Sequence, residues 1–323
     1  MELHIPALGR VLPAAPGANL LATLREHGVP ISYSCTAGRC GTCRCKLIEG
    51  KLGSTDDKEV GGQYVLACTS VLLDTCTIEV PEPDEVITHP ARILKASVTA
   101  VDQLTHDVRR LRLRPAKPLA FSPGQYATLQ FTPEHIRPYS MAGLATDEEL
   151  EFHVRVVQDG LVSGYIDRDL KVGDTVRVSG PLGTSYLRQK HEGPMLCVAG
   201  GTGLAPVLSI VRGAIDAGMR NDIHLYFGVR GPRDVYGLDT LARLAAGHRN
   251  LHLHVVVADG AAADGMRSGL VTDAVAQDWR SLEGWRAYLC GAPPMVDAAT
   301  LVARERGIAF EHIYADAFYA KAA

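Results

Sequence analysis

The chain has 323 residues, of which 46% are hydrophobic and 21% charged, with a formal net charge of -3 and a mean hydropathy of +0.03. This length allows two or three domains that each bury a core, and the composition excludes disorder and collagen-like structure. No basic block indicates nucleic-acid binding, no apolar run of about 18 residues is long enough to span a bilayer, and residues 1–10 lack a secretory signal pattern. We therefore expect a cytoplasmic protein with no membrane or nucleic-acid partner.

The N-terminal region predicts a small α+β unit. Its pattern favours strands at 2–5, 44–48 and 76–80 and a short helix at 19–27. Residues 1–90 hold 11 acidic against 7 basic side chains, a balance that suits docking to a basic partner. The proline-rich acidic stretch at 81–85 is typical of a linker, so we place the first domain at residues 1–89.

Four of the eight cysteines fall within eleven consecutive positions of this unit. Cys35, Cys40 and Cys43 are separated by four and then two residues, and Cys68 follows after 24 more, which is the plant-type 2Fe-2S spacing. The short residues between them let backbone N–H groups approach the sulfurs. A zinc site is the alternative, although zinc usually takes two separate pairs of close ligands. The other cysteines are interpreted as small core residues, namely Cys45, Cys76, Cys197 and Cys290.

Residues 90–189 predict an antiparallel β-barrel, because short alternating runs are separated by proline and glycine turns. Within it, Arg137-Pro138-Tyr139-Ser140 places a cation, an aromatic ring and a hydroxyl on one extended piece, which suits a phosphorylated aromatic cofactor. Gly160 to Ser163 stands at a predicted helix start and offers N–H groups to a pyrophosphate. Taken alone, the first motif is more typical of a surface turn and the second of a helix cap, but their order inside one barrel favours a cofactor site.

Residues 190–323 predict a parallel sheet with helices on its faces, because apolar runs alternate with helical stretches. The turn Gly200 to Pro206, with Gly201, Thr202 and Gly203 at its centre, joins the first strand to its helix and suits a dinucleotide pyrophosphate. Arg230 and Arg233 follow the second strand, where NAD-binding proteins often have an acid. They are interpreted either as solvated arginines or as a site for the 2′-phosphate of NADPH, so the choice between NADH and NADPH stays open.

Two later segments complete the candidate sites. Cys290-Gly291-Ala292-Pro293 follows a predicted strand, where Gly291 allows close backbone approach and the prolines begin a helix, so the segment is expected to line a nicotinamide pocket. Residues 314–319 are rich in aromatic side chains. They are expected either to dock against a flat group or to pack into the core.

With these motifs in this order, the whole chain resembles the reductase components of naphthalene 1,2-dioxygenase-type systems, within the ferredoxin-NADP reductase-like superfamily. The resemblance implies FAD on the Arg137 to Ser140 strand and the Gly160 to Ser163 turn, NAD(P)H on the glycine turn and the Cys290 segment, and Phe318 against the flavin. The implied cofactor-binding residues are Arg137, Pro138, Tyr139, Ser140, His153, Arg155, Gly160, Val162, Ser163, Gly201, Thr202, Gly203, Arg230, Cys290, Gly291, Ala292, Pro293 and Phe318.

The resemblance also implies a reaction. A hydride passes from NAD(P)H to the flavin, and single electrons then leave through the 2Fe-2S cluster to a separate Rieske-type ferredoxin and, through it, to a terminal oxygenase for aromatic compounds such as naphthalene or salicylate. No general acid or base is expected, because catalysis consists of positioning the two rings. The alternatives are a reductase that feeds a diiron monooxygenase directly and a non-catalytic redox sensor. A monomer is expected, since no heptad pattern argues for self-association.

Overall fold

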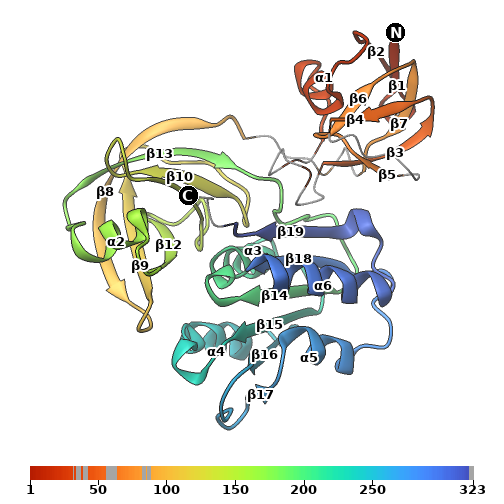
Figure 1. The fold of residues 1–323 in the computed structure, drawn as a ribbon. Helices are drawn as coiled ribbons and strands as arrows, with labels where there is room; N and C mark the ends of the chain where they lie inside the picture. Colours follow the sequence, from red (N-terminus) through yellow and green to blue (C-terminus); the bar gives the residue numbers. More distant parts are fainter. Residues whose placement is uncertain are drawn as a thin grey trace. The chain divides into compact units, whose positions relative to one another are not determined.

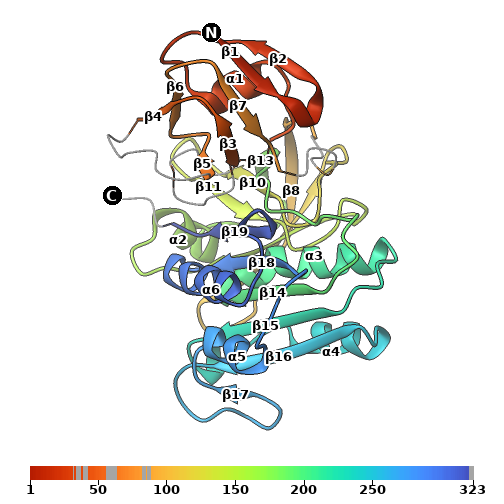
Figure 2. The same ribbon diagram turned by 90° about the vertical axis from the view of Figure 1, so that its right-hand side faces the viewer.

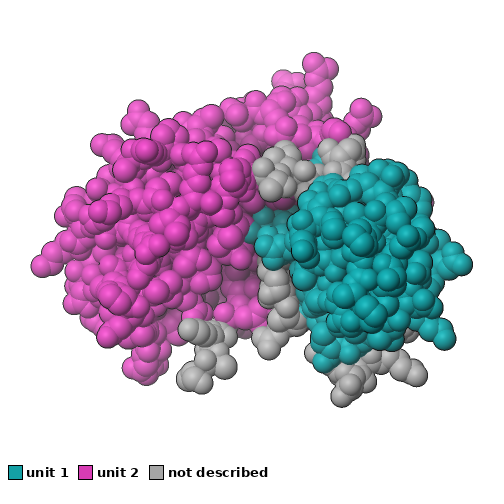
Figure 3. Space-filling view, turned by 90° about the horizontal axis from the view of Figure 1, so that it is seen from above, with its two compact units in different colours: residues 1–88, 183–185 teal, residues 89–182, 186–323 magenta. Residues whose placement is uncertain are grey.

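The computed structural model describes residues 1–31, 33, 38, 43–55, 64–81, 85 and 89–319. They form two compact units, which Figure 3 shows in different colours. The first unit contains residues 1–88 and 183–185, and the second contains residues 89–182 and 186–323. Each unit has its own hydrophobic core, so each is described by itself.

The first unit is a mixed sheet that packs against one helix (Figure 1). Helix α1 (Leu20–Glu26) begins at Asn19, whose side chain accepts a hydrogen bond from Ala22 N at 3.0 Å and caps the helix. Its leucines are buried on the sheet. The five-stranded sheet has the order β2-β1-β7-β3-β5, and the other two strands pair separately, with bounds β1 Glu2–Ile5, β2 Arg10–Pro13, β3 Arg44–Glu49, β4 Leu52–Ser54, β5 Tyr64–Leu66, β6 Ser70–Leu72 and β7 Cys76–Glu79.

The second unit begins with a six-stranded antiparallel sheet in the order β11-β10-β13-β8-β9-β12, which curls into a nearly closed barrel. A bridge between Met141 and Phe152 brings its two edges together. Along β12 the side chains of Phe152 and Val154 enter the barrel core, so the alternate residues face away from it. The bounds are β8 Arg92–Gln103, β9 Val108–Pro115, β10 Tyr126–Gln130, β11 Ile136–Ser140, β12 Leu150–Arg155, β13 Thr175–Leu182 and helix α2 Leu161–Arg168.

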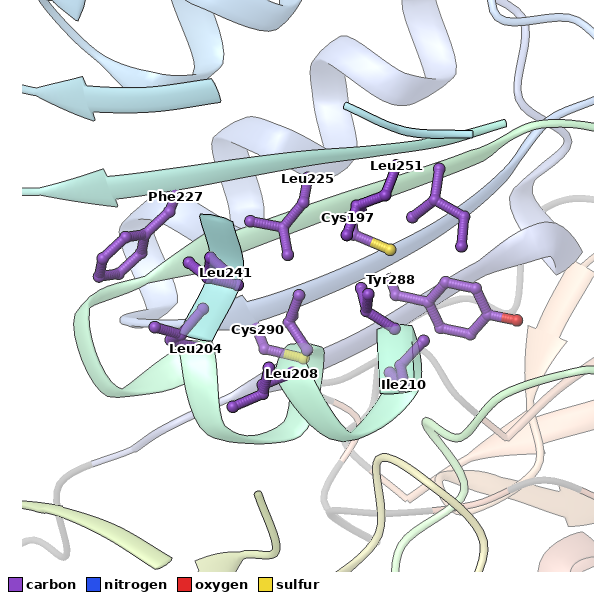
Figure 4. Packing of buried hydrophobic residues seen from close by; sticks show 14 of the residues in the cluster. Cys197, Leu204, Leu208, Ile210, Leu225, Phe227, Leu241, Leu251, Tyr288 and Cys290 are labelled. Carbon is purple, nitrogen blue, oxygen red and sulfur yellow. The ribbon is translucent and has the colours of Figure 1, made fainter. Parts of the chain in front are cut away.

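The second unit continues with a six-stranded parallel sheet in the order β17-β16-β15-β14-β18-β19. Helices α3 and α4 cover one face and α5 and α6 the other (Figures 1 and 2). Figure 4 shows the core beneath α3, where Cys197 and Cys290 lie among leucines. The bounds are β14 Met195–Gly200, α3 Leu204–Asp216, β15 Ile223–Val229, α4 Leu238–Gly247, β16 Leu251–Val257, β17 Arg267–Ser268, α5 Val271–Asp278, β18 Arg286–Gly291, α6 Pro293–Glu305 and β19 Ile313–Ala317.

The predicted fold class is confirmed in all three parts: an α+β ferredoxin-like unit, an antiparallel barrel and a parallel α/β sheet. The aromatic C-terminal segment turns out to be an ordered edge strand, β19, which pairs with β18. Tyr314 is buried and stacks on Tyr288, with ring centroids 5.2 Å apart. In the described part of the chain, no helix is long and apolar enough to cross a membrane.

Candidate cofactor sites

Two of the four predicted cluster cysteines lie in the described residues, and both receive backbone N–H groups. Cys68 N donates to Cys43 Sγ at 3.4 Å, and Gly38 N donates to Cys68 Sγ at 3.2 Å. Amide donors stabilise the negative charge of a thiolate ligand, so these contacts fit an iron-sulfur cluster. Cys43 is buried and Cys68 half-buried. Cys35 and Cys40 lie outside the described residues.

The remaining cysteines are packed in apolar surroundings. Cys45 and Cys76 belong to the core of the first unit. Burial, together with the neighbouring Cys68, raises the pKa of the Cys45 thiol to about 12, so this thiol stays protonated. Burial likewise raises the pKa of Cys197 to about 12. Protonated, buried thiols behave as small hydrophobic side chains.

The Arg137 to Ser140 motif forms strand β11 at the edge of the barrel. Burial raises the pKa of the Tyr139 hydroxyl, although the nearby Arg137 charge lowers it in part, so the hydroxyl stays neutral. Arg137 Nη2 donates to Tyr319 O at 3.4 Å, and Ser140 Oγ donates to Asp316 Oδ2 at 3.3 Å. The motif therefore meets the end of β19 while its own strand stays paired to β10.

The second barrel motif begins helix α2. Gly160 is the N-cap residue, and Ser163 is buried in the first turn, where its Oγ accepts a hydrogen bond from Val157 N at 3.1 Å. Val162 packs against the barrel core. The first N–H groups of a helix have no partner within the helix, so this end of α2 suits a phosphate.

The glycine turn and the Cys290 segment lie side by side, at the carboxyl ends of the neighbouring strands β14 and β18. Gly203 approaches β18 so closely that an added Cβ would collide with the Cys290 carbonyl oxygen and lie 2.9 Å from Gly291 N. Pro293 begins α6, as the sequence predicts. The two segments thus form one edge that suits a dinucleotide.

Strand β19 brings the chain end to the same edge. Phe318 N donates to Gly291 O at 2.8 Å, which continues the β18–β19 pairing by one residue. Asp316 accepts the hydrogen bond from Ser140, and burial raises its pKa to about 6. The barrel motif, the Cys290 segment and the C-terminal segment, predicted separately, therefore meet in space.

His153 and Arg155 share one face of β12, which faces the glycine turn. His153 Nδ1 lies 3.0 Å from the Tyr236 hydroxyl. Arg155 pairs with Asp107 at 3.3 Å, and its guanidinium lies 3.2 Å from where a Cβ on Gly201 would be. This face therefore lies against the glycine turn of the same unit.

Helix α3 fixes the parallel sheet to the barrel by polar contacts. Arg212 forms two hydrogen bonds of 2.8 Å with Asp147, and Ser209 Oγ donates to Gly143 O at 2.6 Å. Arg230 is exposed immediately after β15, and no hydrogen bond or ion pair of its side chain occurs among the described residues. Its place is compatible with the predicted contact to the adenosine end of a dinucleotide.

Sequence reasoning assigns no role to Glu151 or Tyr236, although both lie in this region. The period of two along β12 is a signal for Glu151, because it shares a face with His153 and Arg155. Tyr236 carries no comparable signal, since its proximity to β12 depends on the tertiary fold. Asp316 lies within the aromatic segment 314–319, but its contact with Ser140 is likewise tertiary.

Three family models match successive parts of the chain: a 2Fe-2S iron-sulfur cluster binding domain at 4–73, an oxidoreductase FAD-binding domain at 95–186 and an oxidoreductase NAD-binding domain at 197–300. The chain is 59% identical to the naphthalene 1,2-dioxygenase system ferredoxin--NAD(P)(+) reductase component of Pseudomonas putida, over 99% of both chains. It belongs to the ferredoxin--NAD(P)(+) reductase component family.

Two further comparisons support this family. The chain is 60% identical to the reductase component of the naphthalene 1,2-dioxygenase/salicylate 5-hydroxylase systems of a Ralstonia species, over 99% of both chains. Among solved structures, the crystal structure of the Amycolatopsis cytochrome P450 reductase GcoB matches with a TM-score of 0.74 and 33% identity, over 98% of both chains. The reductase family and its three cofactor-binding domains, predicted from the motifs, are confirmed.

Proposed function

We propose that this protein oxidises NAD(P)H and delivers single electrons to a Rieske-type ferredoxin of an aromatic-ring-hydroxylating dioxygenase in the cytoplasm. The supporting observation is the meeting of β11, the Cys290 segment and β19 at the Ser140–Asp316 and Phe318–Gly291 hydrogen bonds. This meeting puts the predicted flavin strand beside the predicted nicotinamide segment. We propose three functional regions: residues 1–89 for the cluster, 90–189 for FAD and 190–323 for NAD(P)H.

The barrel would hold FAD. Arg137 supplies a cation, Tyr139 a ring with a neutral hydroxyl, and Ser140 a hydroxyl that Asp316 already orients. The start of α2, from Gly160 to Ser163, would bind the pyrophosphate through its N–H groups. When bound, FAD accepts two electrons as a hydride and releases them singly to a one-electron carrier. The chain's own residues then only have to orient the two rings and exclude water.

The parallel sheet would hold NAD(P)H. The glycine turn supplies N–H groups and the helix α3 N-terminus to its pyrophosphate, with Arg155 as a nearby cation. Ala292 and its neighbours in the Cys290 segment would line the nicotinamide side, with Phe318 against the flavin. Arg230 would stand at the adenosine end, where a cation can bind the 2′-phosphate of NADPH, so NADH and NADPH are both candidate substrates.

The cluster in the first unit would be the exit for electrons. Cys43 and Cys68 are two of its four proposed ligands, together with Cys35 and Cys40. We propose that the acidic balance of this region favours a basic docking surface on the acceptor, and that the protein is a monomer.

The decisive experiment is an anaerobic NADH titration of the purified protein that follows flavin absorbance and electron paramagnetic resonance together. We expect the flavin to bleach and a reduced 2Fe-2S signal to develop. Addition of an oxidised Rieske ferredoxin should then remove that signal. If NADH changes neither spectrum, the proposal is wrong; if the ferredoxin leaves the signal unchanged, the proposed acceptor is wrong.

A further inference from the structure

A chain of three side chains connects the barrel to the glycine turn. Glu151 and His153 lie on β12, and Tyr236 lies between β15 and α4. His153 Nε2 is 3.1 Å from Glu151 Oε1, His153 Nδ1 is 3.0 Å from the Tyr236 hydroxyl, and this hydroxyl is 3.4 Å from Gly201 O. We infer that Tyr236, held by His153 and Glu151, is a positioning residue for the turn that binds the nucleotide pyrophosphate. The inference rests on the proposed use of that turn.

The chemistry of the three groups fixes the direction of their hydrogen bonds. Burial raises the pKa of Glu151, but the His153 hydrogen bond and the Arg110 and Arg112 charges outweigh it, so the group is a carboxylate and only accepts. His153 Nε2 therefore carries a proton and donates to Glu151 Oε1. Burial raises the pKa of Tyr236, so its hydroxyl keeps its single proton. Because a carbonyl oxygen only accepts, this proton points to Gly201 O, and the Tyr236 oxygen is the acceptor for an N–H on His153 Nδ1. The barrel thereby fixes the position of the Tyr236 oxygen.

Tyr236 is held from its other sides as well. It is buried, its ring meets Phe227 edge-on with centroids 5.6 Å apart, and it meets the His153 ring edge-on at 5.3 Å. A ring fixed in this way cannot swing away from the turn without opening the core beneath α3. The contact with Gly201 O is therefore a property of the packed domain and not of a loose side chain.

The glycine turn needs such a contact because of its own conformation. Gly201 has φ +54°, in a region where glycine changes conformation at little cost, so the peptide between Gly201 and Thr202 lacks the usual steric restraint. In a trans peptide, the Gly201 carbonyl and the Thr202 N–H point in opposite directions. Tyr236 and Leu204 N both contact this carbonyl. Holding it keeps the Thr202 N–H directed to the side where the start of a helix binds anions.

Tyr236→Phe tests the inference, because it removes only the hydroxyl. We expect the KM for NADH to rise by about three- to tenfold, the range that loss of one weak hydrogen bond produces. The turnover number with ferricyanide and the FAD content should stay at wild-type values. Tyr226→Phe is the matched control: its hydroxyl bonds to Asp278 and Trp279 and its side chain packs in the core beneath α5 and α6, so the KM should not change.

A second pair of variants separates positioning from general packing. His153→Leu should raise the KM as Tyr236→Phe does, whereas His153→Asn places an amide N–H donor near the place of Nδ1 and should restore the KM towards the wild-type value. An unchanged KM in Tyr236→Phe, or equal KM values in the two His153 variants, would overturn the inference. If Tyr236→Phe loses FAD or fails to fold, the two His153 variants decide the question.

Gly203→Ala distinguishes failure of the positioning role from failure of the proposed function, because this substitution disturbs the glycine turn directly. A raised KM in Gly203→Ala together with an unchanged KM in Tyr236→Phe rejects the positioning role alone. An unchanged KM in both rejects the proposed use of the glycine turn itself, and the positioning role with it.

Discussion

The tightest packing at the proposed nucleotide edge lies at Gly203, and its substitution by alanine has a calculable consequence. Gly203 has φ -60° and ψ -13°, a conformation that alanine adopts readily, so the effect of Gly203→Ala is purely steric. The new Cβ would collide with the Cys290 carbonyl oxygen and would lie 2.9 Å from Gly291 N. Both are backbone atoms, so neither can rotate away as a side chain would. Overpacking of this kind costs about 1–3 kcal/mol. If the turn shifts to relieve it, the KM for NADH should rise by about 5- to 150-fold.

The assay is steady-state NADH oxidation with ferricyanide, which accepts electrons at the flavin. FAD content, measured by absorbance, should stay at one per chain, because Gly203 lies in the turn between β14 and α3 and belongs to neither barrel motif. Gly247→Ala is the control, since its Cβ would meet nothing within 4 Å and its φ is not positive. A KM for Gly203→Ala equal to that of Gly247→Ala would refute the reasoning.

Three further results are expected. Cys68→Ser should abolish electron transfer to a one-electron acceptor that docks at the cluster and spare NADH–ferricyanide activity at the flavin; equal loss of both in the two assays would contradict separate sites. Burial, with the neighbouring His252 and His254, lowers the pKa of His224 from 6.5 to about 4. As the pH falls, His224 therefore binds a proton in the unfolded protein before it does so in the folded protein. The contribution of His224 to stability is complete above pH 6.5 and should be lost as the pH falls towards 4. The melting temperature of His224→Gln should accordingly fall less across that range than that of the wild type. The pH dependence of Asp316 has the opposite sign, because burial raises its pKa from 3.8 to about 6 and its contribution to stability is lost as the pH rises through 6. Asp316→Asn should therefore raise the melting temperature at pH 8 but not at pH 4. An equal effect of the substitution at the two pH values would count against this expectation.

The local parts of this protein could be predicted from its sequence because their causes are local. Asn19 begins a helix since its side chain caps the first turn, and the glycine turn follows a strand whose apolar residues are consecutive. The close spacing of Cys35, Cys40 and Cys43 indicates the cluster, and the structure adds backbone N–H donors to the sulfurs of Cys43 and Cys68. Periodicity, capping and ligand spacing all act over short distances along the chain.

The relations between these parts could not be predicted. The contact between Ser140 and Asp316 joins residues 176 positions apart, and that between His153 and Tyr236 joins residues 83 positions apart. Nothing in either local sequence specifies its partner, because the barrel and the sheet must first form and pack. The C-terminal aromatic residues show the same limit: both interpretations were open until β19 placed Tyr314 in the core and Phe318 beside Gly291.

Helix α3 has a consequence for how this protein loses its structure. The helix packs on the parallel sheet, and through Ser209 and Arg212 it is also bonded to barrel loops. Melting either the barrel or the sheet would expose one side of α3 and break these bonds, so the two domains should denature as one cooperative block. The first unit has an independent core. A reductase that has lost only the fold of its first unit should therefore still be able to oxidise NADH and to pass electrons to a soluble acceptor that reaches the flavin.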